Sequence, residues 1–373
     1  MKTIGVITYH ESINYGANLQ AYALQEVLRG MGYAPEVIDY NAPQMFCASL
    51  SRLHWLRHVA WCNIARLLVG TERQEKTKRF RQKHMRISPR QYCDLETLHS
   101  EPPCYDAYVT GSDQVWNPFI QGNDPSYFLT FAPVGRRRIA YAASFGLSRI
   151  PDQFTTQYRE WLSRIHYLST RELEGKLIIK ELTGREAEVT LDPTLLLDEQ
   201  HWCRIAVPYD TDRPYILCYY MPGDKLVNRS IDEIARQVST LTGWDIVSIG
   251  QKEYMRLVPW RRSIFDAGPD DFIGLVQNAS FIVTNSFHGT AFAANYGKPF
   301  AIPVNPALPP ERALSSRITS LLRILGLEDR LVPAGESLPA GYILDVDYRE
   351  AGMILQQERQ KSIDFLRNAL EGA

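Results

Sequence analysis

Short runs of β-branched and aromatic residues alternate along this chain with longer segments whose apolar residues recur at helical spacing. In the first half, the strand-like runs lie at residues 3–8, 35–40, 105–113, 137–146 and 166–172. The helical pattern over residues 18–33 stops at Gly30 and Gly32. Such alternation favours parallel sheets covered on both faces, because each parallel strand needs a crossover segment before the next.

The same pattern restarts in the second half. Strand-like runs lie at residues 214–221, 244–250, 280–287 and 299–304, with helices expected at 225–242, 270–279 and 289–296. Two such series predict an α/β protein with two Rossmann-like domains, over residues 1–195 and 196–345. A last helix within residues 346–373 is expected to pack back on the first domain.

Residues 51–90 interrupt this order with an amphipathic stretch and then a strongly basic one. One interpretation is a helical insertion in the first domain with a solvated basic face. The alternative is a surface for anionic lipid, or for the diphosphate of a lipid-linked sugar, and hence a peripheral membrane contact.

The composition is that of a globular protein, with 45% hydrophobic and 22% charged residues and a net charge of −1, which argues against a nucleic-acid partner. The sequence contains no apolar run of about 18 residues, and its first apolar run is interpreted as a strand rather than a signal peptide. Six cysteines without CxxC pairs or zinc-ligand spacing indicate reduced thiols and a cytoplasmic protein.

Motifs of several common enzyme classes are absent from the sequence. No GxGxxG follows the first strand, and there is no GxxxxGK[ST], HExxH or GxSxG. These absences argue against a nicotinamide-dependent enzyme, a P-loop NTPase, a zincin and an α/β-hydrolase.

Polar residues follow the first expected strand, where open α/β sheets bind their ligands. Gly16 leaves room for a close backbone approach, and Asn14, Asn18 and Gln20 offer amide groups beside a helix start that favours an anion or sugar hydroxyls. A structural alternative is that Asn18 caps the helix.

A second polar group, in the sequence GSDQVWN, contains Ser112, Asp113, Trp116 and Asn117. An aromatic face beside carboxylate and amide groups suits a sugar ring. The alternative for Asp113 is that its side chain only fixes the turn.

Two further positions lie at the ends of expected strands in the first domain. Arg171 stands between a strand and a helix, where a guanidinium suits a carboxylate or phosphate; a surface salt bridge is the alternative. The segment Asp192–Thr194 is interpreted as a helix cap or a domain hinge.

The stretch TNSFHGTAFAANYGKPF, residues 284–300, contains one histidine, His288. We expect His288 and Gly289 in a loop, with Thr290 at the start of a helix. A phosphate bound there would favour the protonated histidine and hold its proton ready for donation, although a structural histidine is the alternative.

These pieces, in this order, resemble the polysaccharide pyruvyl transferase family. The matching residues are NYGANLQAYAL, GSDQVWN, YAASFG, STRE, DPTLLL, SFHGTAFAANYGKPF and SSRITSLLRILGL. The resemblance implies a fold similar to the two-domain GT-B architecture. It also implies transfer of the pyruvyl unit of phosphoenolpyruvate to sugar hydroxyls as a ketal, in capsule or exopolysaccharide synthesis, on a glycan precursor that we expect to be lipid-linked.

The resemblance makes His288 the catalytic histidine and Arg171 a ligand of the donor anion, and the other roles are expected from the residues themselves. His288 is the catalytic acid, and Asp113 is our candidate base. The donor side comprises Arg171, Ser286, Gly289, Thr290, Lys298 and Arg317. The acceptor side comprises Asn14, Tyr15, Gly16, Asn18, Gln20, Ser112, Trp116 and Asn117. No metal or other cofactor is expected, because phosphoenolpyruvate is a co-substrate and side chains neutralise its charge.

One position departs from the family pattern. Many members have arginine two residues before the histidine, where this chain has Ser286. Candidates for the missing charge are Arg317, which we rank first, Lys298, Lys252 and the pair Arg261 and Arg262. The protein is expected in the cytoplasm with its phosphoenolpyruvate, at the inner face of the membrane if the basic insertion binds lipid.

Two other functions are compatible with the sequence. One is a nucleotide-sugar glycosyltransferase of GT-B fold; aligning its common donor-site motif puts Phe292 where a ribose-binding glutamate is usual, which argues against a nucleotide. The other is an inactive carbohydrate-binding relative, an interpretation that Ser286 supports.

Overall fold

The computed structural model describes residues 1–41, 71–222, 224–250, 258–308, 316–338, 342 and 347–372. The chain forms two compact units. Unit 1 comprises Met1–Leu68, Thr77–Leu196 and Glu358–Ala373, and unit 2 comprises Val69–Lys76 and Leu197–Gln357. In contrast to the predicted division, residues 346–357 and the short segment Val69–Lys76 belong to unit 2.

Unit 1 contains a seven-stranded parallel sheet in the order β3-β2-β1-β4-β5-β6-β7. Its strands are β1 (Thr3–Ile7), β2 (Ala34–Tyr40), β3 (Ile87–Tyr92), β4 (Ala107–Thr110), β5 (Arg137–Ala143), β6 (Tyr167–Thr170) and β7 (Glu188–Val189). The order reverses between β1 and β4, as in a Rossmann sheet, so this is the switch point of unit 1.

The helical segments assigned to this half are α1 (Tyr15–Gly30), α4 (Leu95–Ser100), α5 (Pro118–Gln121), η2 (Pro125–Phe128), α6 (Asp152–Ser163), α7 (Leu173–Thr183) and η3 (Pro193–Leu195). Two helices contain residues of both units, namely α3 (Thr71–His84) and α14 (Arg349–Glu371). Within unit 1, Arg359 of α14 donates to the Leu195 carbonyl, and Ser362 accepts from the Leu191 N–H.

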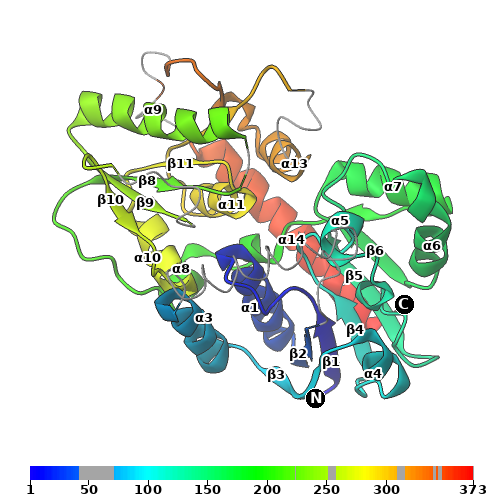
Figure 1. Cartoon of the computed structure of the whole chain (residues 1–373). Coiled ribbons are helices and arrows are strands. Elements are labelled where there is room, and N and C mark those ends of the chain that lie inside the picture. The colour runs from blue at the N-terminus through cyan, green and yellow to red at the C-terminus, as the bar shows by residue number, and fades with distance from the viewer. Residues whose placement is uncertain are drawn as a thin grey trace, which may run out of the picture. The chain divides into compact units, whose positions relative to one another are not determined.

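Unit 2 repeats the plan with a six-stranded parallel sheet in the order β10-β9-β8-β11-β12-β13. Its strands are β8 (Tyr215–Tyr219), β9 (Asp245–Ile249), β10 (Arg262–Ile264), β11 (Phe281–Thr284), β12 (Phe300–Val304) and β13 (Leu331–Pro333). Its helical segments are α8 (Glu199–Cys203), α9 (Lys225–Thr242), α10 (Pro269–Asn278), α11 (Phe287–Asn295), α13 (Ser316–Leu325) and η5 (Glu328–Arg330). In Figure 1, α9 lies on one face of this sheet and α10 and α11 on the other. The switch point lies between β8 and β11.

Two Rossmann-like sheets in one α/β chain confirm the predicted fold class. The sequence pattern missed four strands, which stand at the edges of the two sheets: β3, β7, β10 and β13. Pro89 and polar residues interrupt the pattern of β3, and edge strands tolerate both because one side of the strand needs no partner.

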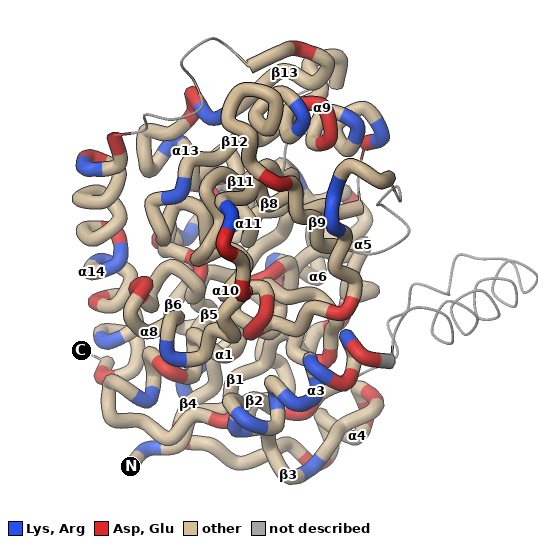
Figure 2. The backbone as a smooth tube through the Cα atoms, turned by 90° about the vertical axis from the view of Figure 1, so that its left-hand side faces the viewer, with Lys and Arg blue, Asp and Glu red and all other residues tan. Residues whose placement is uncertain are grey.

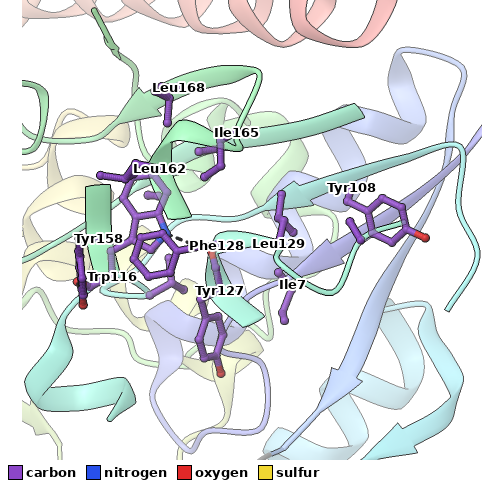
Figure 3. Packing of buried hydrophobic residues seen from close by; sticks show 14 of the residues in the cluster. Ile7, Tyr108, Trp116, Tyr127, Phe128, Leu129, Tyr158, Leu162, Ile165 and Leu168 are labelled. Atoms are coloured by element: carbon purple, nitrogen blue, oxygen red, sulfur yellow. Dashed lines mark hydrogen bonds between the residues drawn. The ribbon is translucent and has the colours of Figure 1, made fainter. Parts of the chain in front are cut away.

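The aromatic core of unit 1 includes Trp116, which the sequence placed in a sugar site. Its ring is fully buried, lies almost parallel to Phe128 with centroids 5.2 Å apart, and donates its indole N–H to the Tyr127 carbonyl at 3.0 Å (Figure 3). The prediction for Trp116 is therefore wrong, because a ring inside the core presents no face to a sugar.

The predicted insertion over residues 51–90 is partly corrected. Residues 42–70 lie outside the described part, and β3 belongs to the sheet of unit 1 rather than to an inserted helix. Figure 2 shows both charge signs along α3. Within unit 2, Lys76 contacts Asp271 at 3.0 Å and Asp266 at 3.4 Å, so the basic run is not simply a solvated face.

No helix in the described ranges is both long and apolar enough to cross a membrane.

Candidate functional site

The candidate residues occupy the carboxyl-terminal edges of the two sheets, and we describe each edge within its own unit. Thr8 follows β1 and Ser112 follows β4, on either side of the switch point of unit 1. Tyr220 follows β8 and Asn285 follows β11, on either side of the switch point of unit 2. Open α/β sheets bind ligands at these positions.

The start of α1 is built from the amides that the sequence assigned to an acceptor. The Oδ1 of Asn14 accepts from the Gly16 N–H at 2.9 Å, so Asn14, and not Asn18, is the helix cap. Asn18 and Gln20 are fully buried, and Gln20 donates to the Thr8 hydroxyl at 2.8 Å. These amides hold the β1–α1 connection together.

Tyr15 of the same helix is also fully buried. Asn117 caps α5 by accepting from the Phe119 N–H at 3.0 Å. The side chains of Tyr15, Asn18, Gln20 and Asn117 are buried, so their exposure does not support acceptor roles. Asn14 is partly exposed but its side chain caps α1, and Gly16 remains a predicted point of backbone approach.

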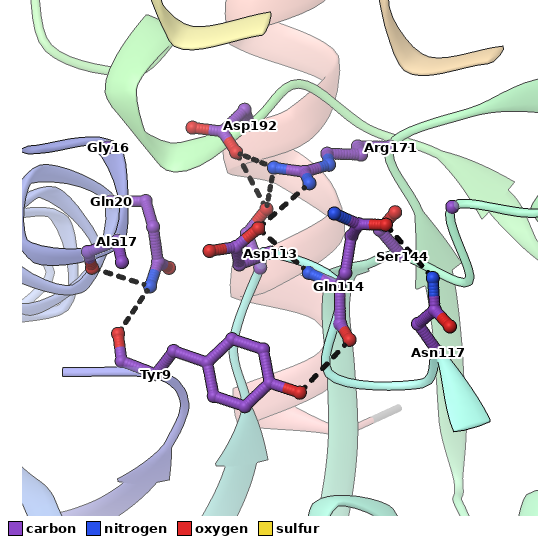
Figure 4. A network of polar contacts seen from close by, with 12 residues as sticks. Tyr9, Gly16, Ala17, Gln20, Asp113, Gln114, Asn117, Ser144, Arg171 and Asp192 are labelled. Carbon is purple, nitrogen blue, oxygen red and sulfur yellow. Dashed lines mark hydrogen bonds and ion pairs between the residues drawn. The ribbon is translucent and has the colours of Figure 1, made fainter. Parts of the chain in front are cut away.

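Arg171 lies directly after β6 at the centre of a buried polar network (Figure 4). Its Nη1 donates to Asp192 at 2.7 Å and its Nη2 donates to Asp113 at 3.2 Å, while Glu172 lies 3.9 Å from its Nε. Ser112 donates to the same oxygen of Asp192 at 2.7 Å. One guanidinium thus lies within 4 Å of three carboxylates.

This arrangement corrects the role predicted for Arg171. Its side chain is 1% exposed, and its pKa is raised above the ordinary value, because Asp192, Asp113 and Glu172 together outweigh burial, the largest single influence, which lowers it. A guanidinium surrounded by carboxylates is poorly placed to bind the anions of a donor. In the structure, Arg171 holds the carboxylates of Asp113 and Asp192 in place.

Asp113 is the member of this network that reaches solvent, with 14% of its side chain exposed. Its φ is +74°, in the left-handed region that aspartate and asparagine enter more readily than other non-glycine residues. Its Oδ1 accepts from the Gln114 N–H at 2.9 Å, as the turn-fixing alternative requires. Asp192 caps η3 by accepting from the Thr194 N–H at 3.0 Å, which confirms its predicted capping role.

Sequence reasoning missed a second cluster at this edge, formed by His10, Glu11 and Asp39. The His10 Nε2 lies 3.1 Å from Asp39 Oδ1, and its Nδ1 donates to the Thr8 carbonyl at 3.2 Å. Burial raises the pKa of Asp39, but the hydrogen bond and charge of His10 contribute to a net lowering. Within the described residues, these three side chains are the group with the spacing of metal ligands. The signal available in the sequence was a histidine–glutamate pair just after the first strand.

In unit 2, His288 occupies the first turn of α11. Ser286 is the N-cap, and its hydroxyl accepts from the Gly289 N–H at 3.3 Å. The helix therefore begins at Phe287, and the predicted loop position of His288 and Gly289 is wrong. Ser286 has a clear local role, because serine is among the best N-cap residues and arginine is not.

The turn that carries His288 packs tightly against the sheet. A Cβ at Gly289 would lie 2.6 Å from Thr284 Oγ1 and 3.0 Å from the Tyr219 ring, so only glycine permits this approach. Thr290 is fully buried, and its hydroxyl donates to the Ser286 carbonyl at 3.0 Å. The predicted donor residues Gly289 and Thr290 thus shape the backbone around His288.

Amides join the neighbouring strand ends of unit 2. Asn285 accepts from the Met221 N–H at 2.8 Å and donates to Asn228 of α9 at 3.1 Å. Asp224, the N-cap of α9, accepts from Asn305 at 3.1 Å, a bond that is the largest cause of its lowered pKa. These bonds fix the ends of β8, β11 and β12 relative to one another.

The two cations predicted on the donor side have different positions. The Arg317 guanidinium lies 5.8 Å from the centre of the Phe287 ring, and that ring contacts His288 with centroids 5.1 Å apart. Lys298 follows α11 and precedes β12, at the opposite edge of the sheet, since a nine-residue helix is about 13 Å long. The structure therefore favours Arg317 and argues against Lys298, whose pKa is lowered by burial despite Glu199.

The other proposed sources of charge, and Phe292, are also placed by the structure. Arg261 is buried and pairs with Asp232, whereas Arg262 contacts the Tyr209 ring; Lys252 lies outside the described residues. Phe292 is buried against Trp202 and Phe272. A phenylalanine in the core does not contact a ligand, so Phe292 does not argue against a nucleotide.

The fold and these edges define an α/β protein with two Rossmann-like units and polar switch points. The family model for polysaccharide pyruvyl transferases matches residues 14–304, most of the chain. The protein therefore belongs to the polysaccharide pyruvyl transferase family.

Solved structures with similar backbones are distant in sequence. MnaA from S. aureus, solved with UDP, is 11% identical with a TM-score of 0.49, and the match covers 100% of this chain and 97% of that one. UDP-GlcNAc 2-epimerase from Neisseria meningitidis, bound to UDP-GlcNAc, is 13% identical with a TM-score of 0.49. The match covers 99% of this chain and 100% of that one. E. coli ADP-heptose LPS heptosyltransferase II is 13% identical with a TM-score of 0.38. The match covers 99% of this chain and 98% of that one. Curated proteins give no match.

Proposed function

We propose that this protein transfers the pyruvyl group of phosphoenolpyruvate to two hydroxyls of a sugar in a polysaccharide precursor and forms a cyclic ketal. The observation that carries the proposal is the position of His288, in the first turn of α11 at the switch point of unit 2. Arg317 shares the Phe287 ring with it. Family membership supports the type of group transferred.

On the donor side, His288 gives a proton to the methylene carbon of phosphoenolpyruvate, which leaves C2 electrophilic. General acid catalysis of this kind contributes about 10²–10⁴-fold to the rate. The N-terminus of α11 and Arg317 stabilise the negative charge of phosphate and carboxylate, and the bound phosphate in turn stabilises the imidazolium.

On the acceptor side, the first sugar hydroxyl attacks C2 and its proton passes to a base. Asp113 is the proposed base. The second hydroxyl then attacks C2 as the bond from C2 to the phosphate oxygen breaks. Of the two hydroxyl protons, one replaces the proton given by His288 and the other leaves with inorganic phosphate. Both side chains return to their starting states.

Side chains supply the charges in this scheme, and phosphoenolpyruvate is consumed as a co-substrate. We therefore expect turnover to persist in EDTA. A loss of turnover in EDTA that Mn²⁺ or Zn²⁺ restores would instead give the cluster of His10, Glu11 and Asp39 a role.

The test is an incubation with phosphoenolpyruvate and galactose, mannose or N-acetylmannosamine acceptors, free and lipid-linked. Phosphate release together with a mass gain of one pyruvyl unit supports the proposal. Parallel reactions receive UDP-sugars instead of phosphoenolpyruvate. Glycosyl transfer there, with no pyruvyl product from any acceptor, would identify a glycosyltransferase and overturn the proposal.

A further inference from the structure

A pocket of about 810 Å³ lies at the amino-terminal edge of the sheet in unit 1, where β5 and β6 begin. Its lining residues are Gly135, Arg136, Arg137, Ser163, Arg164, Ile165, His166, Tyr167 and Arg185. β5 has seven residues and spans about 23 Å, so this pocket and Asp113 lie at opposite edges of the same sheet.

The lining is strongly basic. It contains four arginines and a histidine, and no lining residue in this described region is Asp or Glu. Two carboxylates lie near its rim: Glu160 accepts from Arg164 at 2.5 Å, and Asp106 lies 3.7 Å from Arg136. Both carboxylates are about half exposed, so they neutralise the arginines only weakly.

Backbone carbonyls hold two of the arginines in place. Arg185 donates to the Leu162 and His166 carbonyls, each at 3.0 Å, and Arg137 donates to the Ala369 carbonyl of α14 at 3.2 Å. Guanidinium groups fixed by neutral carbonyls retain their full charge, and they lose less conformational freedom when they bind an anion.

The cations also act on one another. Burial lowers the pKa of His166, and the charges of Arg138, Arg137 and Arg185 lower it further. The pKa of Arg138 is likewise lowered, first by burial and then by Arg164. A bound anion would relieve this repulsion.

We propose that this pocket is a second ligand site, which binds a multiply charged phosphate-type anion such as a diphosphate group. The fork-like guanidinium groups among its lining residues match the oxygens of such a group. The inference is independent of pyruvyl transfer, because none of these residues belongs to the proposed donor or acceptor side.

The test measures the binding of inorganic pyrophosphate to the full chain by isothermal titration calorimetry. The His288→Ala protein serves as the background, so that binding at the donor site is reduced. We expect saturable binding of one pyrophosphate that weakens as salt is added. Arg136→Gln and Arg164→Gln are each expected to weaken it about tenfold, since each removes one charge-assisted contact.

The matched control is Arg149→Gln, an exposed arginine of the same unit that pairs with Asp152 outside the pocket. It is expected to bind pyrophosphate as the parent does. All three arginines are at least 42% exposed, so the variants are expected to fold, and circular dichroism checks this.

Flotation with phosphatidylcholine vesicles, with and without phosphatidic acid, distinguishes the sources of the anion. Binding to the acidic vesicles that depends on Arg136 and Arg164 would support a lipid head group as the ligand. Pyrophosphate binding without vesicle binding would support a free diphosphate compound. If both probes bind the two pocket variants as tightly as the parent, or bind none of the proteins, the proposal is wrong.

Discussion

The two units share one strand order but present different chemistry at the same edge. In unit 1, Arg171 and three carboxylates form a buried network with an excess of negative charge. In unit 2, a histidine in the first turn of a helix contacts the Phe287 ring, with Arg317 close to that ring, and amides join the adjacent strand ends. Strand order thus fixes where the switch point of each unit lies, while a few residues after each strand determine the charge there.

The strongest test of this contrast removes the histidine of unit 2. His288→Ala is expected to lower kcat by about 10²–10⁴-fold, because the proton donor is lost, with the fold unchanged. The control is His201→Ala, an exposed histidine of the same unit. Steady-state phosphate release measures both, and full activity of His288→Ala would exclude the proposed acid.

The corresponding test in unit 1 concerns stability. Arg171→Met is expected to lower the free energy of unfolding by about 3–5 kcal/mol, since it leaves buried carboxylates unpaired. Urea denaturation measures the change against Arg149→Met, whose side chain is 74% exposed and whose loss is expected to cost less than about 0.5 kcal/mol. A loss for Arg171→Met no larger than that of the control would contradict the buried network.

The next prediction concerns the close packing that holds His288. Gly289→Ala forces a methyl group against Thr284 and Tyr219 and is expected to cost about 1–3 kcal/mol of stability, with reduced kcat as His288 shifts. Gly352→Ala is the control, because its Cβ would meet nothing within 4 Å in α14. Thermal unfolding is expected to show a gain of about 0.5–1 kcal/mol for the control. Equal effects at both positions would contradict the tight contact.

The smallest expected effect belongs to the helix cap of unit 2. Ser286→Ala is expected to lower stability by about 1 kcal/mol, while Ser286→Asn keeps an accepting oxygen and most of the stability. Denaturant unfolding of both variants checks this. If alanine and asparagine behave alike, the hydroxyl of Ser286 does not cap α11.

The sequence pattern predicted the central strands of both sheets, because buried parallel strands are continuous apolar runs. It missed edge strands such as β3, whose sequence ISPRQY is half polar. It also could not show which way a side chain points. Trp116 and Phe292 were assigned to ligand sites, but both lie in hydrophobic cores. An aromatic residue beside polar neighbours gives the same sequence pattern whether it lies in a core or in a binding site.

The candidate site was predicted in part for a similar physical reason. His288 comes four residues after the end of β11, so the edge of the sheet at which it lies was predictable. Lys298 is ten residues further along the chain and lies at the opposite edge, because the rest of α11 runs between them. The partners of Arg171 come from two distant segments, and only the folded sheet brings Ser112 and Asp113 together with Asp192. The pair His10 and Asp39 likewise depends on the alignment of β1 with β2.

The backbone at Asp113 restricts which residues this position tolerates. With φ at +74°, a β-branched or bulky side chain would be strained there, so glycine, asparagine and aspartate are the residues that fit. Asp113→Asn is therefore a clean substitution that changes the charge and keeps the turn, whereas Asp113→Val would combine lost charge with a distorted backbone. In a saturation library selected for folding alone, we expect position 113 to be confined to a few residue types. Selection for turnover would then show which of them performs the chemistry.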